Sequence, residues 1–199
     1  MSPLDDSGAV ARIGPNAITR VAEALVAARG SAADVFGAAG LTHYLDEPPE
    51  AMVDERDVTA LQQALRAQLD AETARGIGHD AGLRTGDYLL AHRIPRPAQR
   101  LLKLLPPGPA SALLLKAVGK HAWTFSGSGD FSYTIGRPVQ VRIQDCPLCR
   151  GSQADVPVCD FYRGTFERLF TTLVHRKTQV IETQCQAMGA EACVFEMRW

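Results

Sequence analysis

The chain has 199 residues, a net charge of −1, and 46% hydrophobic and 22% charged residues, a composition typical of a globular protein with a real core. The near-zero charge excludes a global attraction to nucleic acid or anionic lipid. No stretch reaches the roughly 18 apolar residues of a membrane span. The start, MSPLDDSGAV, lacks the basic and apolar segments of a secretory signal. We therefore expect a cytoplasmic protein with no transmembrane segment and no nucleic-acid partner.

The N-terminal half has the pattern of a helical region. Residues 1–14 are predicted to be a flexible tail. Apolar residues at helical spacing then predict a helix that ends at Gly30, and a longer amphipathic helix begins near Asp57. We expect residues 15–199 to form a single domain.

Two glycine-rich stretches resemble nucleotide-binding loops only superficially. They are GIGHDAG at 76–82 and GSGD at 127–130. A dinucleotide fingerprint needs a strand immediately before the glycines, and neither stretch has one. We interpret 76–82 as a junction between helices and 127–130 as a turn that leads into a strand.

Residues 97–118 contain two leucine-rich helices, separated by the helix breaker PPGP at 106–109. The leucines are too numerous for one narrow stripe, so these helices should be buried on most sides or line an apolar cavity. Basic residues that can meet ligand carboxylates are interspersed with them: Arg93, Arg96, Arg100, Lys116 and Lys120.

The leucine-rich segment and the aromatic residues after it supply a candidate ligand-binding surface. The candidate residues are Leu101, Leu105, Leu114, His121, Trp123, Phe125, Phe131 and Tyr133. His121 is the best candidate for an axial ligand to a bound metal ion. The alternatives are a helix-capping role for His121 and ordinary core packing for the aromatic residues.

In the C-terminal half the hydrophobic period changes from 3.6 to 2. Segments 131–135 and 139–143 predict one β-hairpin, and 178–185 and 192–199 predict another. An amphipathic helix, with Pro157 near its start, separates the two hairpins. The fold class is therefore α+β, with a helical N-terminal half and two hairpins around a helix in the C-terminal half.

All five cysteines lie between residues 146 and 199, a distribution that favours metal or redox chemistry over a disulfide framework. Cys185 and Cys193 flank a tight turn, and Cys159 lies at the first turn of the preceding helix. Glu182 is a candidate fourth ligand for zinc, which favours four thiolate, imidazole or carboxylate ligands. An odd separation from Cys185 requires the strand to bulge or end between the two. The alternative is small core residues.

Cys146 and Cys149 form a separate C-x-x-C pair, CPLC. Such a pair can be a redox couple, half of a metal site or two loop thiols. It follows a hairpin instead of opening a helix, which argues against a thioredoxin-like role. We keep both residues as secondary metal ligands, and an iron–sulfur cluster stays an alternative to zinc.

The run from PVC at 157–159 through E-x-x-C-x-A-M-G-x-x-x-C-x-F at 182–195 resembles the 4-vinyl reductase domain family. In sensor members of that family a zinc ion is held by a cysteine, a glutamate and two more cysteines. The resemblance implies Cys159, Glu182, Cys185 and Cys193 as ligands of a structural zinc. It also implies the ligand-binding fold of nitric-oxide-sensing and vesicle-tethering domains, and a homodimer.

The stretch RIPRPAQRLLKLLPP at 93–107 further resembles the J-type bacteriochlorophyll biosynthesis branch of this family. That likeness implies a tetrapyrrole ligand. We expect a binding protein that carries a Mg-porphyrin of the Mg-protoporphyrin IX type. The neighbouring enzymes would be the large subunit of Mg-chelatase and Mg-protoporphyrin methyltransferase. One alternative is an 8-vinyl (4-vinyl) reductase with an external reductant, since no hydride-cofactor motif is present. Another is a small-molecule sensor or adaptor.

Overall fold

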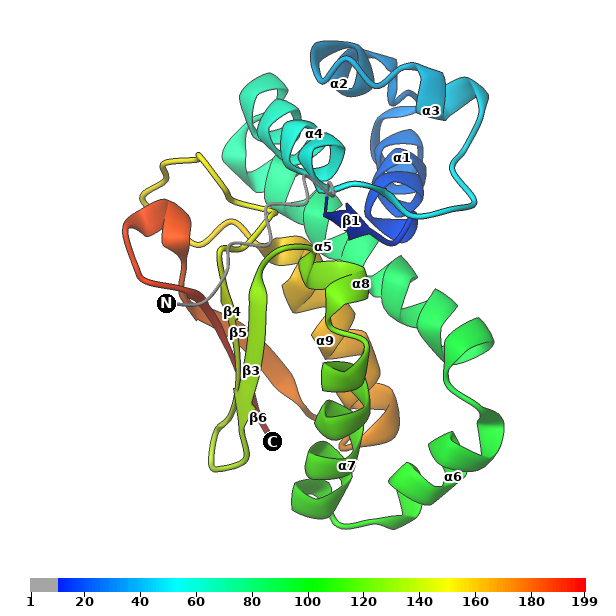
Figure 1. Ribbon diagram of the computed structural model, residues 1–199, viewed down its shortest axis with the longest axis vertical. Coiled ribbons are helices and arrows are strands. Elements are labelled where there is room, and N and C mark those ends of the chain that lie inside the picture. The colour runs from blue at the N-terminus through cyan, green and yellow to red at the C-terminus, as the bar shows by residue number, and fades with distance from the viewer. Residues whose placement is uncertain (1–10) are drawn as a thin grey trace, which may run out of the picture.

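In the computed structural model, which describes residues 11–199, a helical region and a four-stranded sheet are joined through two long helices (Figure 1). The helices of the first half are α1 (Asn16–Arg29), α2 (Ala33–Ala38), α3 (His43–Asp46), α4 (Glu55–Gln68) and α5 (Ala71–Tyr88). A π-helical turn η1 (Leu89–Arg93) then leads to α6 (Arg96–Leu104), α7 (Pro107–Lys120) and α8 (Trp123–Ser126). The helix expected to end at Gly30 does so, with Gly30 in the left-handed conformation that favours glycine.

The remaining elements are mostly strands. They are β1 (Arg12–Ile13), β2 (Val53–Asp54), β3 (Asp130–Thr134), β4 (Val139–Gln144), α9 (Asp160–Leu173), β5 (Gln179–Gln184), the 3₁₀ turn η2 (Gln186–Met188) and β6 (Cys193–Arg198). Residues 1–10 of the predicted tail lie outside the described residues. The tail boundary at residue 14 is wrong, because β1 pairs with β2 and Ile13 is buried in the core.

The two predicted hairpins are confirmed, and they join into one antiparallel sheet with the order β3-β4-β6-β5. Alternate residues of β4, namely Val139, Val141 and Ile143, are fully buried on the face that α9 covers. The opposite face is polar and open. The turn predicted at 127–130 is also confirmed, with Gly127 at a positive φ of 58° just before β3.

The ladder between β5 and β6 shifts register between Glu182 and Gln184. Such a shift is a β-bulge, which inserts one residue and redirects the side chains that follow it. The sequence required a bulge or an end of the strand before Cys185. The structure confirms that requirement, and the bulge lets Glu182 and Cys185 reach the same side.

The junction predicted at 76–82 is wrong. These residues form the middle of α5, one continuous helix. Their glycines allow α5 and α9 to pack closely: a Cβ on Gly82 would lie 2.1 Å from the Phe161 carbonyl oxygen, and one on Gly164 would lie 2.3 Å from that of His79. Because the packing gained from this close approach is tertiary, it outweighs the helix-weakening effect of glycine.

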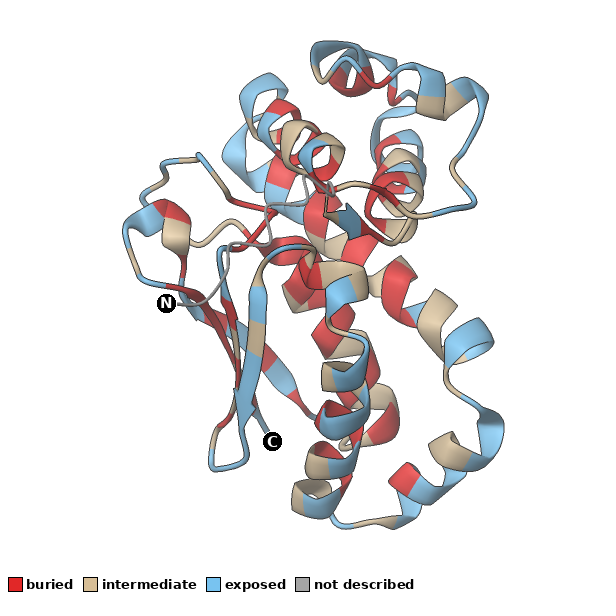
Figure 2. Ribbon diagram, in the orientation of Figure 1, coloured by how far each residue is buried: buried red, intermediate tan, exposed pale blue. Residues whose placement is uncertain are grey.

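The two predicted leucine-rich helices are confirmed as α6 and α7, but the expectation that they are buried on most sides is wrong. Leu101, Leu104 and Leu113 are 51%, 84% and 41% exposed, whereas Leu102 is buried. Figure 2 shows the exposed stretches on these two helices, which extend away from the rest of the molecule. We name η1, α6 and α7 (residues 89–120) the leucine arm. Along residues 11–199, no helix is long and apolar enough to cross a bilayer.

Candidate metal centre and ligand-binding arm

All five cysteines converge at one end of the sheet, where the loop after β4, the start of α9 and the β5–β6 turn meet. We name Cys146, Cys149, Cys159, Cys185 and Cys193 the thiol cluster. Each is buried and none is in a disulfide. The Sγ–Sγ distances are 3.6 Å from Cys159 to Cys146 and to Cys193, 3.4 Å from Cys149 to Cys193, and 3.9–4.0 Å from Cys185 to Cys193 and Cys159.

Glu182 is the one carboxylate in this cluster of thiols. It is 7% exposed, and its Oε2 accepts a 2.8 Å hydrogen bond from the Cys159 backbone N–H. Burial, followed by the charge of Cys185, raises the pKa of Glu182 to about 9. Within residues 11–199 its second oxygen, Oε1, is buried and has no hydrogen-bond partner, so a ligand-capable oxygen lies free beside the thiols.

These donors fit a metal ion. Cys159, Glu182, Cys185 and Cys193 each offer one ligand atom, and these atoms all lie within 4.8 Å of one another. A zinc–sulfur bond is about 2.3 Å, so tetrahedral ligands lie about 3.8 Å apart, close to the thiol spacing seen here. The unpartnered Glu182 oxygen is the observation that favours an ion over plain core packing. The four residues selected from the sequence are therefore brought together.

Cys146 and Cys149 lie in the segment 145–152, which we name the cysteine loop. Helix α4 holds this loop by its backbone carbonyls: Thr59 Oγ1 donates to Pro147 at 2.7 Å, and Gln63 Nε2 donates to Arg150 at 3.0 Å. The loop is thus fixed by residues more than eighty positions earlier in the chain.

Arg66 of α4 is the positive charge nearest the thiol cluster. Its Nη2 donates to the Leu148 carbonyl at 3.0 Å and to Ser152 Oγ at 2.8 Å, while Nη1 is buried without a partner among the described residues. Burial lowers the pKa of Arg66, and the charge of Cys159 acts against that shift. The sequence analysis missed Arg66, because nothing in an ordinary polar helix face distinguishes it.

Gln186 was also missed, although it lies inside the recognised motif. Its Oε1 accepts a 2.7 Å hydrogen bond from the Cys146 backbone N–H, and its Nε2 donates to the Glu191 carbonyl at 3.1 Å. It therefore ties the cysteine loop to the β5–β6 turn. A glutamine between two ligand cysteines was the only available signal.

A second polar cluster fastens the other end of the cysteine loop. Glu55, at the start of α4, accepts hydrogen bonds from Ser128 N–H at 2.8 Å and from Arg150 Nη1 at 2.7 Å. Burial works to raise the pKa of Glu55, but the hydrogen bonds from Ser128 and the charge of Arg150 outweigh it and lower the pKa. Glu55 is ionised at neutral pH and joins three distant segments.

The candidate ligand-binding residues do not form one surface. Leu114 is buried in the core at 2% exposure, so it is not available on the surface. Phe125 and Phe131 are half-buried and pack edge-to-face with ring centroids 5.4 Å apart, and Phe125 packs also against Tyr162. For these three residues the structure shows core packing. Leu105 is intermediate in burial.

The other candidates are exposed. Trp123 is 60% exposed and Tyr133 is 37% exposed. His121 caps the C-terminus of α7 and is also exposed, so its side chain is accessible to a ligand. Together with Leu101 on α6, these residues lie on or next to the leucine arm.

The charge of the leucine arm and its surroundings is one-sided. Between Asp87 and Asp130 the sequence contains no Asp or Glu. The same stretch carries exposed basic residues: Arg93, Arg96, Arg100, Lys103, Lys116 and Lys120. In a chain with a net charge of −1, this segment is a local positive field with exposed leucines beside it.

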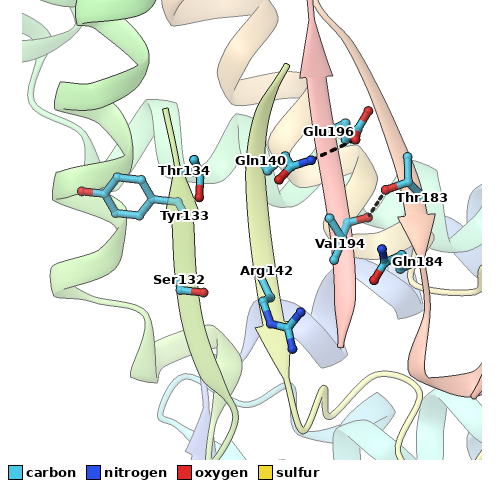
Figure 3. A pocket seen from close by; sticks show the side chains of 9 residues that line it. All are labelled: Ser132, Tyr133, Thr134, Gln140, Arg142, Thr183, Gln184, Val194 and Glu196. Atoms are coloured by element: carbon cyan, nitrogen blue, oxygen red, sulfur yellow. Dashed lines mark hydrogen bonds between the residues drawn. The ribbon is translucent and has the colours of Figure 1, made fainter. Parts of the chain in front are cut away.

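A hollow of about 200 Å³ lies elsewhere, on the open face of the sheet. Figure 3 shows its polar lining, including Arg142 of β4 and Glu196 of β6, whose Oε1 accepts a 3.0 Å hydrogen bond from Gln140. None of the candidate ligand-binding residues except Tyr133 lines it. Its volume is below the roughly 300–1,000 Å³ of small-molecule pockets.

The fold and the site define a class of protein: an α+β ligand-binding module with a thiol-rich centre. The fold is shared with H-NOX proteins. An unliganded one from K. algicida superposes with a TM-score of 0.57 at 11% identity, covering 94% of this chain and 96% of that one. One from S. oneidensis gives 0.52 at 11% identity, covering 94% and 98%. At this identity the likeness shows the fold alone.

The sequence comparisons are more specific. The family model of the vinyl-4-reductase domain matches residues 139–198. The bacteriochlorophyll synthase 23 kDa chain of Cereibacter sphaeroides is 44% identical over 188 residues, which cover 94% of this chain and 90% of that protein. The chain of the same name from Rhodobacter capsulatus is 40% identical, covering 98% and 89%. The chain therefore belongs to the family of bacteriochlorophyll synthase 23 kDa chains, which carries the vinyl-4-reductase domain.

Proposed function

We propose that this chain binds a tetrapyrrole intermediate of bacteriochlorophyll biosynthesis and presents it to the next enzyme. Its relatives in C. sphaeroides and R. capsulatus are named as chains of bacteriochlorophyll synthase, and the chain accordingly has a role in that pathway. The finer proposal, a carrier of a Mg-porphyrin of the Mg-protoporphyrin IX type, rests on the chemistry of the leucine arm.

The observation that carries the proposal is the coincidence of exposed leucines and an acid-free basic stretch. A tetrapyrrole intermediate combines a planar apolar ring with carboxylate side chains. Leu101, Leu104 and Leu113 offer apolar contact area. Arg93, Arg96 and Arg100, with the lysines of the same stretch, offer charge-assisted hydrogen bonds to carboxylates. A ligand with both features can use both kinds of contact at once.

His121 and Trp123 follow the arm directly and are exposed. We assign to the His121 imidazole the axial bond to the bound magnesium, and to the Trp123 indole a stacking contact with the ring. The partners would be the large subunit of Mg-chelatase, as donor, and Mg-protoporphyrin methyltransferase, as acceptor. The expected homodimer stays a prediction, to be measured by analytical ultracentrifugation.

The proposal includes a structural zinc ion at Cys159, Glu182, Cys185 and Cys193. Four protein ligands leave no position for water or substrate, which is typical of a structural zinc site. In this role the ion would fasten the β5–β6 turn to the start of α9. The residues of the leucine arm, not the ion, would bind the tetrapyrrole.

The test is a titration of the purified protein with Mg-protoporphyrin IX, followed by absorbance and tryptophan fluorescence, without reductant. Saturable binding is expected. Mg-octaethylporphyrin, which lacks carboxylates, should bind more weakly, because it cannot pair with the basic residues. Absence of binding would contradict the carrier function. Loss of the vinyl absorption on addition of NADPH or reduced ferredoxin would identify a reductase instead.

Variants locate the binding surface. Arg100→Glu should weaken binding of Mg-protoporphyrin IX about tenfold or more, because it replaces a favourable charge by a repulsive one. Arg29→Glu is the matched control, since Arg29 is also an exposed helical arginine but lies on α1. Equal effects of the two substitutions would show that overall charge, and not the leucine arm, determines the affinity.

A further inference from the structure

The ligand atoms of the thiol cluster fall into two overlapping sets of four. One set is Cys146, Cys149, Cys159 and Cys193, and the other is Cys159, Glu182, Cys185 and Cys193. Within each set all ligand atoms lie within 4.8 Å of one another. The sets share Cys159 and Cys193, whose sulfur atoms are 3.6 Å apart. The site is therefore extended, with a shared edge in the middle and a pair of further ligands on either side.

One tetrahedral ion cannot use all of these ligands. Zinc takes four, so a single ion would leave out either Cys146 and Cys149 or Glu182 and Cys185. Every one of these residues is buried. Leaving out the second pair would strand the Glu182 carboxylate in the interior, and an unpaired buried polar group is costly. Leaving out the first pair would bury two unused thiols against the shared edge.

We propose that the cluster holds two zinc ions bridged by the Cys159 and Cys193 thiolates. Cys146 and Cys149 complete the ligands of the first ion, which is bound by sulfur alone. Cys185 and Glu182 complete the ligands of the second ion. Each ion then has four ligands, and every cysteine of the chain is used.

The sulfur spacing fits this arrangement. Cys146 lies 3.6 Å from Cys159 and Cys149 lies 3.4 Å from Cys193, on one side of the shared edge. Cys185 lies 4.0 and 3.9 Å from the same two bridging residues, on the other side. These values are near the edge of about 3.8 Å expected for a zinc–thiolate tetrahedron. Thiols this close leave no room for the bridging sulfides of an iron–sulfur cluster.

The surroundings supply the charge that such a centre needs. Five thiolates and one carboxylate around two divalent ions leave a formal charge of about −2. Arg66 lies beside the cluster, and within residues 11–199 its buried Nη1 has no hydrogen-bond partner. Its other nitrogen, Nη2, is held by the Leu148 carbonyl of the cysteine loop. A fixed buried guanidinium therefore offsets part of the negative charge on the side of Cys146 and Cys149.

Metal content tests the proposal directly. The protein, produced with zinc and freed of loosely bound metal by gel filtration, should contain two zinc ions per chain by mass spectrometry, with the protein measured by amino-acid analysis. One zinc per chain would overturn the proposal, and so would iron with acid-labile sulfide. No tetrapyrrole enters this measurement, so its outcome is independent of the binding titration.

Two double variants and cadmium NMR show how the ions are arranged. Cys146→Ala with Cys149→Ala should retain one metal ion, and so should Glu182→Gln with Cys185→Ala, the matched variant on the other side. In the wild-type protein loaded with ¹¹³Cd we expect two resonances, split by coupling through the bridging sulfurs. Each variant should give one unsplit resonance. Unsplit wild-type resonances, or a first variant that keeps two ions, would overturn the proposal. If a variant fails to fold, the wild-type spectrum still decides.

Discussion

The thiol cluster and the leucine arm are built in opposite ways. The ligands of the cluster come from the cysteine loop, the start of α9 and both sides of the β5–β6 turn, and α4 holds the loop from the far half of the chain. The residues of the leucine arm come from one continuous segment that extends from the body (Figure 1). A change in the cluster should therefore affect the whole fold, whereas a change on the exposed face of the arm should affect binding alone.

Loss of metal should have the largest effect. Removal by a chelator, or Cys185→Ala, is expected to lower the free energy of unfolding by about 3 kcal/mol or more, because metal binding contributes folding free energy. Thermal unfolding by circular dichroism, with metal content measured in parallel, checks this. Full thermal stability of a metal-free protein would show that the cluster is ordinary core.

The crossing of α5 and α9 gives the next largest effect. Gly82→Ala should destabilise by about 3 kcal/mol, because its Cβ would lie 2.1 Å from the Phe161 carbonyl oxygen and force the helices apart. Gly76→Ala is the matched control on the same helix, with no atom within 4 Å of the added Cβ. It should be neutral or stabilise by up to about 1 kcal/mol. Equal unfolding midpoints in urea would contradict the close packing.

Glu55 sharpens the comparison through pH. Glu55→Gln should cost about 2 kcal/mol at neutral pH, since it removes charge-assisted hydrogen bonds from Ser128 and Arg150. The folded-state pKa is lowered from 4.5. The stability contributed by the ionised group is therefore present above the unfolded-state pKa and is lost as pH falls through the lower folded-state pKa.

The difference in unfolding free energy between wild type and Glu55→Gln should then be constant above about pH 5 and shrink as pH falls below 4.5. Urea unfolding at a series of pH values measures it. A difference that does not change with pH would mean that the charge of Glu55 contributes nothing to the folded state.

Leu104→Ser should have the smallest effect on stability, within about 0.5 kcal/mol, because Leu104 is 84% exposed. Its affinity for Mg-protoporphyrin IX should nevertheless fall, since the apolar contact is lost. Ile181→Ser, at an exposed position of β5 far from the arm in the chain, is the control. If both variants bind as tightly as the wild-type protein, Leu104 is not part of the binding surface.

Local pattern was sufficient to predict most elements and one detail of the site. The odd separation of Glu182 and Cys185 required a bulge, and β5 has a register shift there. The same reasoning failed at 76–82, because glycine weakens a helix locally but here serves a contact with α9, which is distant in sequence. Exposure of Leu104 could not be predicted either, since composition does not indicate which side of an amphipathic helix lacks a neighbour.

The position of Cys146 and Cys149 against Cys159 and Cys193 depends on long-range contacts. The turn of the cysteine loop is set by α4 through Thr59 and Gln63, and no spacing within the loop encodes that. Arg66 was invisible for the same reason. Ligands that lie within one hairpin could be grouped from the sequence, whereas those brought in by packing between halves could not.

Synthesis of the chain delivers β6 last among the described strands, yet β6 lies between β4 and β5 in the sheet. Neither of those two strands can find its shared neighbour until Cys193 and the residues after it have been made. Sheet closure and assembly of the metal ligands must therefore occur together, after translation of nearly all the described residues. Until that moment the nascent protein keeps exposed strand edges and free thiols, which makes timely metal supply a condition for its safe maturation.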